Sequence, residues 1–171
     1  MRTLRALGCC ALLGLALGTR ASAQEAARQG FWIGAGLGYG SIGCEGCDRL
    51  GGASGYFKLG GTLRENVLLG LEVNGWAKSE FGQTMAMGNM SGAAYWYPMS
   101  NAGFFVKGGL GYSMVDDGFI SETGLGLLGG LGYDVKVGRN LSLTPVANWY
   151  RGSFNSGVLN VFDVGLGITS H

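Results

Sequence analysis

The sequence contains few of the side chains on which metal sites and acid–base catalysis most often depend. It has one histidine, the terminal His171, and four cysteines, of which Cys9 and Cys10 lie close to the N-terminus. A structural zinc site takes four nitrogen or sulfur ligands, and catalysis through a histidine needs other groups positioned beside it. We therefore expect no metal and no other cofactor, and we do not expect an enzyme.

The chain also lacks a long hydrophobic run. An apolar stretch near the N-terminus follows Arg2 and Arg5 and ends before the small residues at 21–23. This pattern is typical of a secretory signal peptide, which we assign to residues 1–23, and it is too short for a transmembrane helix. Beyond it, no run approaches the ~18 residues that a helical span needs. If the mature chain enters a membrane, it does so as β-strands.

Positive charge is scarce once the signal peptide is removed. Cleavage takes away Arg2, Arg5 and Arg20 and leaves nine basic residues against eleven acidic ones, so the formal charge changes from +1 to −2. Binding of nucleic acid usually requires a basic patch. We therefore expect no nucleic-acid partner.

Glycine, by contrast, is abundant, with 35 residues in a chain of 171. The stretch GLGLLGGLGYD at 124–134 contains a G-x-G-x-x-G pattern, but the helix that a dinucleotide-binding turn requires has no counterpart in the residues that follow. Here and in GFWIGAGLGYG at 30–40, glycines alternate with bulky apolar residues. A period of two indicates strands with one bulky face and one small face. This regular phase also argues against a disordered chain.

Eight alternating segments follow one another along the mature chain: 31–41, 53–63, 67–78, 88–97, 102–114, 121–136, 140–151 and 158–170. Their usual length is close to the ~9–11 residues of a tilted transmembrane strand. Short polar connections alternate with longer ones, such as SEFGQTMAM and GSFNSG, as in transmembrane barrels. We predict an all-β fold, an eight-stranded antiparallel up-and-down transmembrane β-barrel over residues 31–171. A cleaved signal peptide and a short segment at 24–30 precede it.

The small face of these segments carries Lys58, Glu72, Lys107, Glu122, Asp134 and Asp163, and the other face has almost no charge. In 67–78, for example, Leu69 and Leu71 share one face and Glu72 lies on the other. A soluble barrel needs the reverse arrangement, whereas in a membrane barrel a lipid-facing charge near the midplane costs ~2–4 kcal/mol. We expect the lumenal lysines to pair with acidic residues and plug the interior, although some charges could instead be solvated near the rims. The predicted lumenal charge network consists of Lys58, Glu72, Lys107, Glu122 and Asp163.

Glycines and aromatic residues have expected places in such a barrel. Inner-face glycines make room for larger side chains in a narrow lumen. Aromatic residues near segment ends are expected to form two interfacial girdles; they are Phe31, Tyr39, Trp76, Tyr95, Tyr97, Tyr112, Tyr133 and Trp149. The phase of 88–97 stays open, with either Tyr95 or Trp96 outward. Because Pro145 has no backbone donor, we expect a bulge or a lumenal water beside it.

Cys44 and Cys47, in the sequence IGCEGCDRLGG, are the only cysteines left after cleavage. A zinc site would need a second pair of ligands. A thioredoxin-type pair lies at the N-terminus of a helix, whereas this pair lies in a glycine-rich loop. We therefore predict a local disulfide between them, favoured by the oxidising route of export.

The opening FWIGAGLGYG, the segments FFVKGGLGYS and GLGLLGGLGYDVKVGRNLSLTPVANW, and the closing FDVGLGITSH resemble the small outer-membrane β-barrel family typified by OmpX and the membrane domain of OmpA. This resemblance covers nearly the whole mature chain. It implies a monomer in the outer membrane of a Gram-negative cell envelope, with both termini in the periplasm. The implied partners are outer-membrane lipids, lipopolysaccharide and the outer-membrane assembly machinery. One departure is His171, because the family usually ends in an aromatic residue.

The function we expect is that of a non-catalytic integral outer-membrane barrel with a structural or surface-interaction role. The sequence does not name a partner for its surface loops. Three alternatives stay open: a lipid-modifying barrel enzyme, a small pore and a soluble lipocalin-like binder. Lipid-modifying enzymes on this scaffold work through a histidine with a serine and an acidic residue, whereas His171 is the last residue. A pore is disfavoured because eight strands enclose little space.

Overall fold

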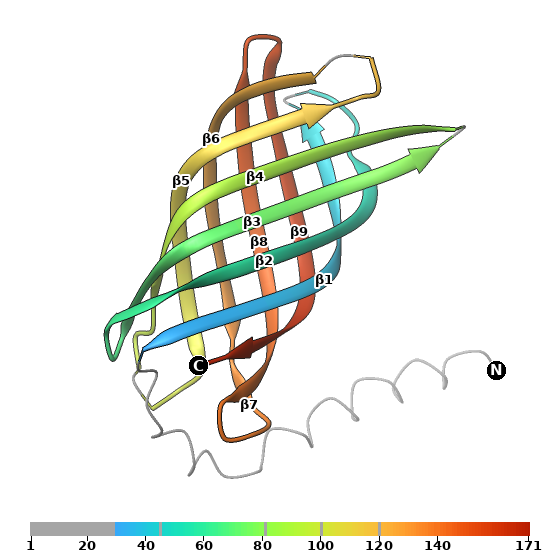
Figure 1. The fold of residues 1–171 in the computed structure, drawn as a ribbon. Coiled ribbons are helices and arrows are strands. Elements are labelled where there is room, and N and C mark those ends of the chain that lie inside the picture. Colours follow the sequence, from blue (N-terminus) through green and yellow to red (C-terminus); the bar gives the residue numbers. More distant parts are fainter. Residues whose placement is uncertain (1–29, 45, 81, 100, 120) are drawn as a thin grey trace, which may run out of the picture.

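The computed structural model describes residues 30–44, 46–80, 82–99, 101–119 and 121–171. The predicted signal peptide and all of the segment at 24–30 except Gly30 lie outside the described residues, as does Glu45. Most of the described chain is β-strand (Figure 1). The strands are β1 (Phe31–Cys44), β2 (Leu50–Arg64), β3 (Val67–Glu80), β4 (Gln83–Trp96), β5 (Phe104–Asp116), β6 (Ser121–Tyr133), β7 (Val135–Lys136), β8 (Leu141–Phe154) and β9 (Gly157–Ser170). Among these residues, no helix is long and apolar enough to span a membrane.

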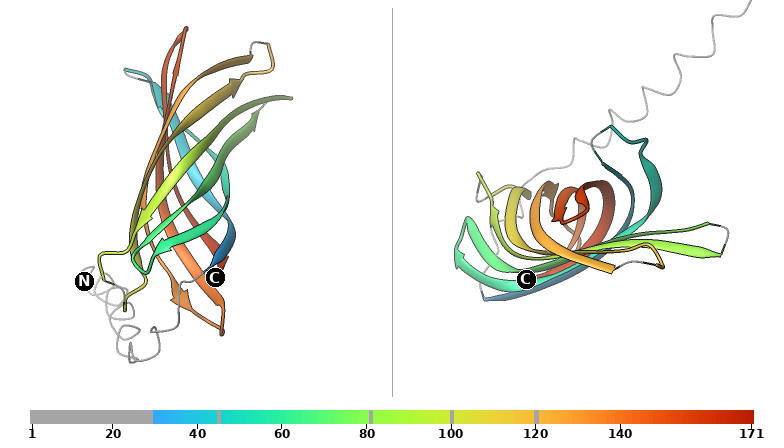
Figure 2. Two further views of the ribbon diagram at one scale, coloured as in Figure 1. Left: turned by 60° about the vertical axis from the view of Figure 1, so that its left-hand side comes forward. Right: turned by 90° about the horizontal axis from the view of Figure 1, so that it is seen from above.

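The strands form one closed antiparallel barrel (Figures 1 and 2). Each strand from β1 to β6 pairs with the next, and β1 also pairs with β9, which pairs with β8. The sheet closes where β8 pairs with both β6 and β7. Because β6 and β7 meet β8 in one continuous register, they act as a single strand. The predicted all-β, eight-stranded, up-and-down barrel is confirmed.

The two ends of the barrel carry different connections. We call the end with the connections 45–49, 81–82, 117–120 and 155–156 the loop end. The opposite end carries the connections 65–66, 97–103 and 137–140 together with His171, and we call it the C-terminal end. Phe31 also lies at the C-terminal end, because Ile33 pairs with Ser170.

Two connections expected to be long loops are mostly strand. The ladder between β3 and β4 runs out to the pair Glu80 and Gln83, and that between β8 and β9 runs to Phe154 and Gly157. Gly82 has φ 81° and Gly157 has φ 146°, conformations in which glycine meets no steric penalty. The polar composition of these stretches suggested loops, but two paired strands satisfy their backbones in water as well as in lipid. Figure 2 shows the β3–β4 hairpin projecting beyond the rest of the barrel wall.

The outer face of the barrel is apolar. Large hydrophobic side chains are exposed on each of the long strands, on β8 only at its first residue, Leu141. They include Leu37, Phe57, Leu69, Leu71, Val73, Met90, Leu110, Leu125, Leu131, Val164, Leu166 and Ile168. The inner face instead buries charged and polar side chains, as the alternation in the sequence predicted. Such an inverted distribution is typical of a barrel surrounded by lipid.

The structure of β4 shows which of its aromatic residues face outward, and it corrects part of the girdle prediction. Trp96 is 52% exposed on the outer face, whereas Tyr95 and Tyr97 point inward and are 1% exposed. Trp76 is also buried in the lumen, where its indole Nε1 donates to the carbonyl of Gly40. The prediction that Trp76, Tyr95 and Tyr97 belong to the girdles is therefore wrong. Of the other expected members, Phe31, Tyr39, Tyr112 and Tyr133 are exposed on the outer face, and Trp149 is half-buried there.

Inner-face glycines form notches for large side chains. A Cβ atom placed on Gly60 or Gly70 would lie 2.6 or 2.8 Å from Cζ2 of Trp32, closer than packed carbon atoms can lie. On β6, a Cβ atom at Gly130 would lie 2.8 Å from Cε of Lys107. The interior of an eight-stranded barrel is narrow, so these side chains fit only because the facing wall positions are bare.

Pro145 fits without the bulge expected for it. The residues on either side keep the same register, since Val146 pairs with Gly132 and Leu143 pairs with Val135. The interruption lies instead at Asp134, which separates β6 from β7; the continuous register places Tyr133 opposite Pro145 and Asp134 opposite Thr144. A local gap in one ladder accommodates the missing donor.

Candidate functional site

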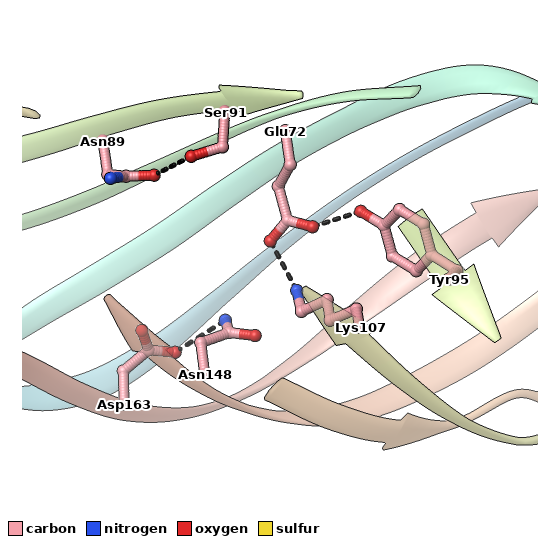
Figure 3. A network of polar contacts seen from close by, with 7 residues as sticks. All are labelled: Glu72, Asn89, Ser91, Tyr95, Lys107, Asn148 and Asp163. Carbon is pink, nitrogen blue, oxygen red and sulfur yellow. Dashed lines mark hydrogen bonds and ion pairs between the residues drawn. The ribbon is translucent and has the colours of Figure 1, made fainter. Parts of the chain in front are cut away.

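A buried ion pair lies in the lumen. The ammonium of Lys107 pairs with Oε1 of Glu72, and the hydroxyl of Tyr95 donates to Oε2 of the same carboxylate (Figure 3). The Glu72 side chain is 0% exposed and that of Lys107 is 1% exposed. The three residues come from the neighbouring strands β3, β4 and β5, and Tyr95 pairs directly with Lys107. Removing one partner of such a pair leaves a charge that water cannot reach.

Lys58 lies next to this pair but in different surroundings. It is 2% exposed, and its Nζ lies 5.2 Å from the ring centroid of Phe105 and 5.4 Å from that of Tyr95. The rings of Trp32 and Tyr56 lie at 5.8 and 5.9 Å. Among the described residues, no carboxylate oxygen comes within ion-pair distance of Lys58. We call these four rings the aromatic cage.

A layer of amides and hydroxyls lies beyond the ion pair. Asn89 donates to Ser113 at 2.9 Å and accepts from Ser91 at 2.6 Å. Asn148 donates to Oδ1 of Asp163 at 3.0 Å (Figure 3). In the part of the chain that the structure describes, Asp163 therefore has an amide as its hydrogen-bond partner, and neither lysine lies within ion-pair distance.

Glu122 lies apart from this cluster. It is half-buried near the loop end, where it accepts hydrogen bonds from the backbone nitrogen and the hydroxyl of Ser156 at 3.3 and 2.8 Å. Of the five residues in the predicted charge network, the structure joins only Glu72 and Lys107 in an ion pair. It gives Lys58, Asp163 and Glu122 other partners.

The C-terminal end holds a second polar cluster. Asp134 accepts hydrogen bonds from the hydroxyls of Tyr97 and Thr144, both at 2.7 Å. Nε2 of His171 lies 3.6 Å from Oδ2 of Asp134, and the backbone nitrogen of His171 donates to the carbonyl of Asn140. Sequence reasoning placed Asp134 on the inner face but did not connect it with the only histidine. The even strand number, which brings the last residue to the end where β6 finishes, could have indicated that connection.

This second cluster does not form a catalytic triad. The Thr144 hydroxyl donates to the Asp134 carboxylate and lies 3.0 Å from Thr169. Among the described residues, no hydroxyl is hydrogen-bonded to either ring nitrogen of His171. A nucleophile of this type needs its base within hydrogen-bond reach. In the described chain, no three His, Cys, Asp or Glu side chains lie close enough together to hold a metal ion.

Cys44, the last residue of β1, forms a disulfide pair with Cys47 in the connection to β2, and their Cα atoms lie 5.2 Å apart. Arg49 follows in the same connection and folds back onto the barrel wall. Its Nε donates to the hydroxyl of Ser41 at 3.0 Å, and its Nη2 donates to the carbonyls of Ser41 and Asn160. The connection between β1 and β2 is therefore held by the disulfide within it and by the hydrogen bonds of Arg49 to β1 and β9.

Comparison with known proteins identifies the fold. No protein-family model matches the sequence. No curated protein sequence matches it either. Neisserial surface protein A is similar in structure at a TM-score of 0.62 and 15% identity, over 83% of this chain and 97% of that one. Ail of Yersinia pestis, solved with the heparin analogue sucrose octasulfate, is similar at a TM-score of 0.60 and 12% identity, over 82% of this chain and 99% of that one. The N-terminal β-barrel domain of Pseudomonas aeruginosa OprF is similar at a TM-score of 0.50 and 16% identity, over 82% of this chain and 98% of that one. The fold is thus that of the small eight-stranded outer-membrane barrels.

Proposed function

We propose that this protein is a non-catalytic integral outer-membrane barrel with a filled lumen and a structural or surface-interaction role. The observation that carries the proposal is the distribution of polarity across the wall. Apolar side chains cover the outside, while the charges of Lys58, Glu72, Lys107, Asp134 and Asp163 are buried inside. A contiguous apolar surface of this extent is unfavourable in water and favourable against acyl chains.

The packing of the lumen supports a closed barrel rather than a pore. In the lumen, Lys107 forms an ion pair with Glu72, and the aromatic cage surrounds the ammonium of Lys58. At the C-terminal end, Tyr97 lies against Phe105, with ring centroids 5.4 Å apart, and binds Asp134. A steady aqueous path would require these buried contacts to separate.

We further propose that the C-terminal end faces the periplasm. An even number of strands returns the chain to its starting side, so both ends of the barrel domain lie together. After removal of residues 1–23 during export, residues 24–30 would be a short periplasmic segment. The loop end would then face outward, among lipopolysaccharide molecules. In this arrangement the chain is a monomer that the outer-membrane assembly machinery inserts.

A folding assay tests the membrane assignment. The mature chain is diluted from urea into buffer alone or into phospholipid vesicles, and folding is followed by the band shift of unheated samples on a gel. We expect a shifted band only with lipid, and no large steady conductance in planar bilayers. A soluble, folded monomer in plain buffer would contradict the membrane assignment, and a stable conductance would contradict the filled lumen.

An activity assay tests the non-catalytic part of the proposal. His171 and Asp134 are the only such imidazole–carboxylate pair among the described residues, so they are the groups to examine. We expect no deacylation or palmitoylation of lipid A by the folded protein. Turnover that is lost in a His171→Gln variant would show that the barrel is an enzyme.

A further inference from the structure

We propose that the outer wall near the loop end binds the phosphorylated headgroup of lipopolysaccharide through Arg49 and Arg151. The two arginines lie above a row of aromatic side chains on β1, β8 and β9. This inference rests on the proposed function, because it requires the barrel to stand in an outer leaflet. It adds a binding surface for lipopolysaccharide and the residues that make it.

The level of the surface follows from a change in polarity on three adjacent strands. On β9 the outward residues run from Val164 through Phe162 to Asn160, and on β8 they run from Ala147 through Trp149 to Arg151. On β1 the outward residues after Leu37 are Tyr39 and then Ser41, which pair with Val164 and Phe162. Each strand thus passes from aliphatic to aromatic to polar within five residues. Aromatic side chains in that position mark the membrane–water interface.

Trp149 and Phe162 form the centre of the aromatic row. They are partners across β8 and β9, and their ring centroids lie 6.4 Å apart. Phe162 is 54% exposed on the outer face. The next pair toward the loop end is Arg151 with Asn160. Arg151 therefore lies one outward position above the row.

Arg49 reaches the same place from the first loop. Its guanidinium carbon lies 5.1 Å from the centroid of the Phe162 ring, and Nη2 donates to the carbonyl of Asn160. The hydrogen bonds to Ser41 fix the orientation of the side chain. Arg49 thus binds Asn160, and Arg151 lies opposite Asn160 in the register, so two cations from distant parts of the sequence lie beside the same residue.

Among the described residues, the two arginines of this surface have no ion-pair partner, since no carboxylate oxygen lies within 4.0 Å of Arg49 or Arg151. A ligand that complements the surface needs an anionic group at the level of the arginines and acyl chains against the apolar outer face on the other side of the aromatic row. Guanidinium groups suit phosphate because they present several donors in a fixed plane. The phosphorylated glucosamine headgroup of lipid A, with its acyl chains, has this combination.

Binding of lipid A to folded variants tests the inference. The wild-type protein in detergent micelles is titrated with diphosphoryl lipid A, and bound lipid is counted by native mass spectrometry. We compare an Arg49→Gln, Arg151→Gln double variant with an Arg64→Gln, Arg139→Gln double variant. The second pair removes the same charge from exposed positions at the C-terminal end.

We expect the first double variant to bind diphosphoryl lipid A at least about tenfold more weakly than wild type, as loss of charge-assisted hydrogen bonds to phosphate predicts. The control variant should bind as wild type does. Monophosphoryl lipid A and phosphatidylglycerol, which carry one phosphate each, should discriminate less between the two variants. Equal binding by both variants, or equal loss in both, would overturn the inference.

The test separates this inference from the proposed function. Each variant is first examined for the band shift that reports folding in lipid. A folded barrel that shows no difference between the variants contradicts the lipid A surface alone. A chain that folds without lipid contradicts the membrane assignment, and with it the premise of the inference.

Discussion

The lumen buries two lysines within reach of the same tyrosine ring, yet it compensates their charges in different ways. Lys107 has the carboxylate of Glu72 as a direct partner. Lys58 has four aromatic rings at 5.2 to 5.9 Å and no described carboxylate within ion-pair distance. A buried ion pair fails when one member is removed, whereas a cation facing several quadrupoles depends on no single neighbour. The two lysines should therefore respond differently to substitution.

The largest expected effect follows from separating the ion pair. A Glu72→Gln variant keeps the shape of the side chain but leaves the buried Lys107 charge without its counter-ion. We expect it to lower the free energy of unfolding by about 3–5 kcal/mol, measured by urea titration in lipid vesicles. The matched control is Glu80→Gln, since the ion pair of Glu80 with Lys78 at 2.8 Å is solvent-exposed. That variant should change the same quantity by no more than ~1 kcal/mol.

A double variant examines the cause. If the cost comes from an uncompensated charge, then Lys107→Met combined with Glu72→Gln should recover most of the lost stability. Additive losses from the two substitutions would show that packing, rather than charge, is what Glu72 contributes.

A smaller loss of unfolding free energy is expected when a glycine in the barrel wall beside the aromatic cage is replaced by alanine. Gly60→Ala places a Cβ atom against the backbone of Leu69 and Gly70 on β3 and 2.6 Å from Trp32, so both the β3 backbone and the indole that faces Lys58 must move. We expect a loss of about 1–3 kcal/mol in the same titration, as for other overpacked interiors. Gly75→Ala is the control, because a Cβ atom there meets nothing within 4 Å. Equal effects of the two substitutions would mean that strand propensity, and not the notch for Trp32, decides the outcome.

Neutralising the caged lysine should cost less again. In Lys58→Met the attraction to the rings, about 2 kcal/mol when desolvated, is lost, but so is the penalty for burying a charge. We expect a net change in unfolding free energy within about 1.5 kcal/mol, because the two contributions offset each other. A loss as large as that of Glu72→Gln would indicate that Lys58 has an anionic partner in solution and would remove the contrast between the two lysines.

These contrasts mark the limit of what the sequence could predict. The alternation of Leu69 and Leu71 with Glu72 was sufficient to place the lumenal charges, because a period of two assigns each residue to one face. It could not assign partners, since a side chain's neighbours in a barrel depend on the stagger between strands as well as on parity. Lys58 lies opposite Glu72 in the register of β2 and β3. Its ammonium nevertheless lies among the rings of Trp32, Tyr95 and Phe105, which come from three other strands.

The ends of the strands were harder to predict than their faces. Trp76 was expected in a girdle because it lies near a segment end, but the β3–β4 hairpin continues past it to Glu80, and its parity turns it inward. Likewise, Glu122 shares the inward parity of the network but lies too near the loop end to join it. Polar residues look alike in a loop and in a paired hairpin that projects into water.

The smallest effect on the barrel is expected from the loop disulfide. Replacing Cys44 and Cys47 with Ser opens a ring of only a few residues, so its entropic contribution is modest and the barrel should stay folded. Limited proteolysis should cut the first loop faster in the variant. Mass spectrometry without reductant should find the wild-type cysteines two hydrogens lighter than free thiols. Free thiols in protein taken from intact membranes, or a bound stoichiometric metal, would contradict the pairing.

The central claim is that the apolar face of the barrel meets lipid and the polar face does not, and tryptophan quenching tests it most directly. Trp96 is 52% exposed on the outer face, whereas Trp76 is 2% exposed in the lumen. Single-tryptophan variants that keep one or the other, with Phe at the remaining three positions, are folded into vesicles that contain brominated phospholipid. We predict strong quenching for Trp96 and little for Trp76. Equal quenching of the two, or none in either folded variant, would contradict the inverted barrel.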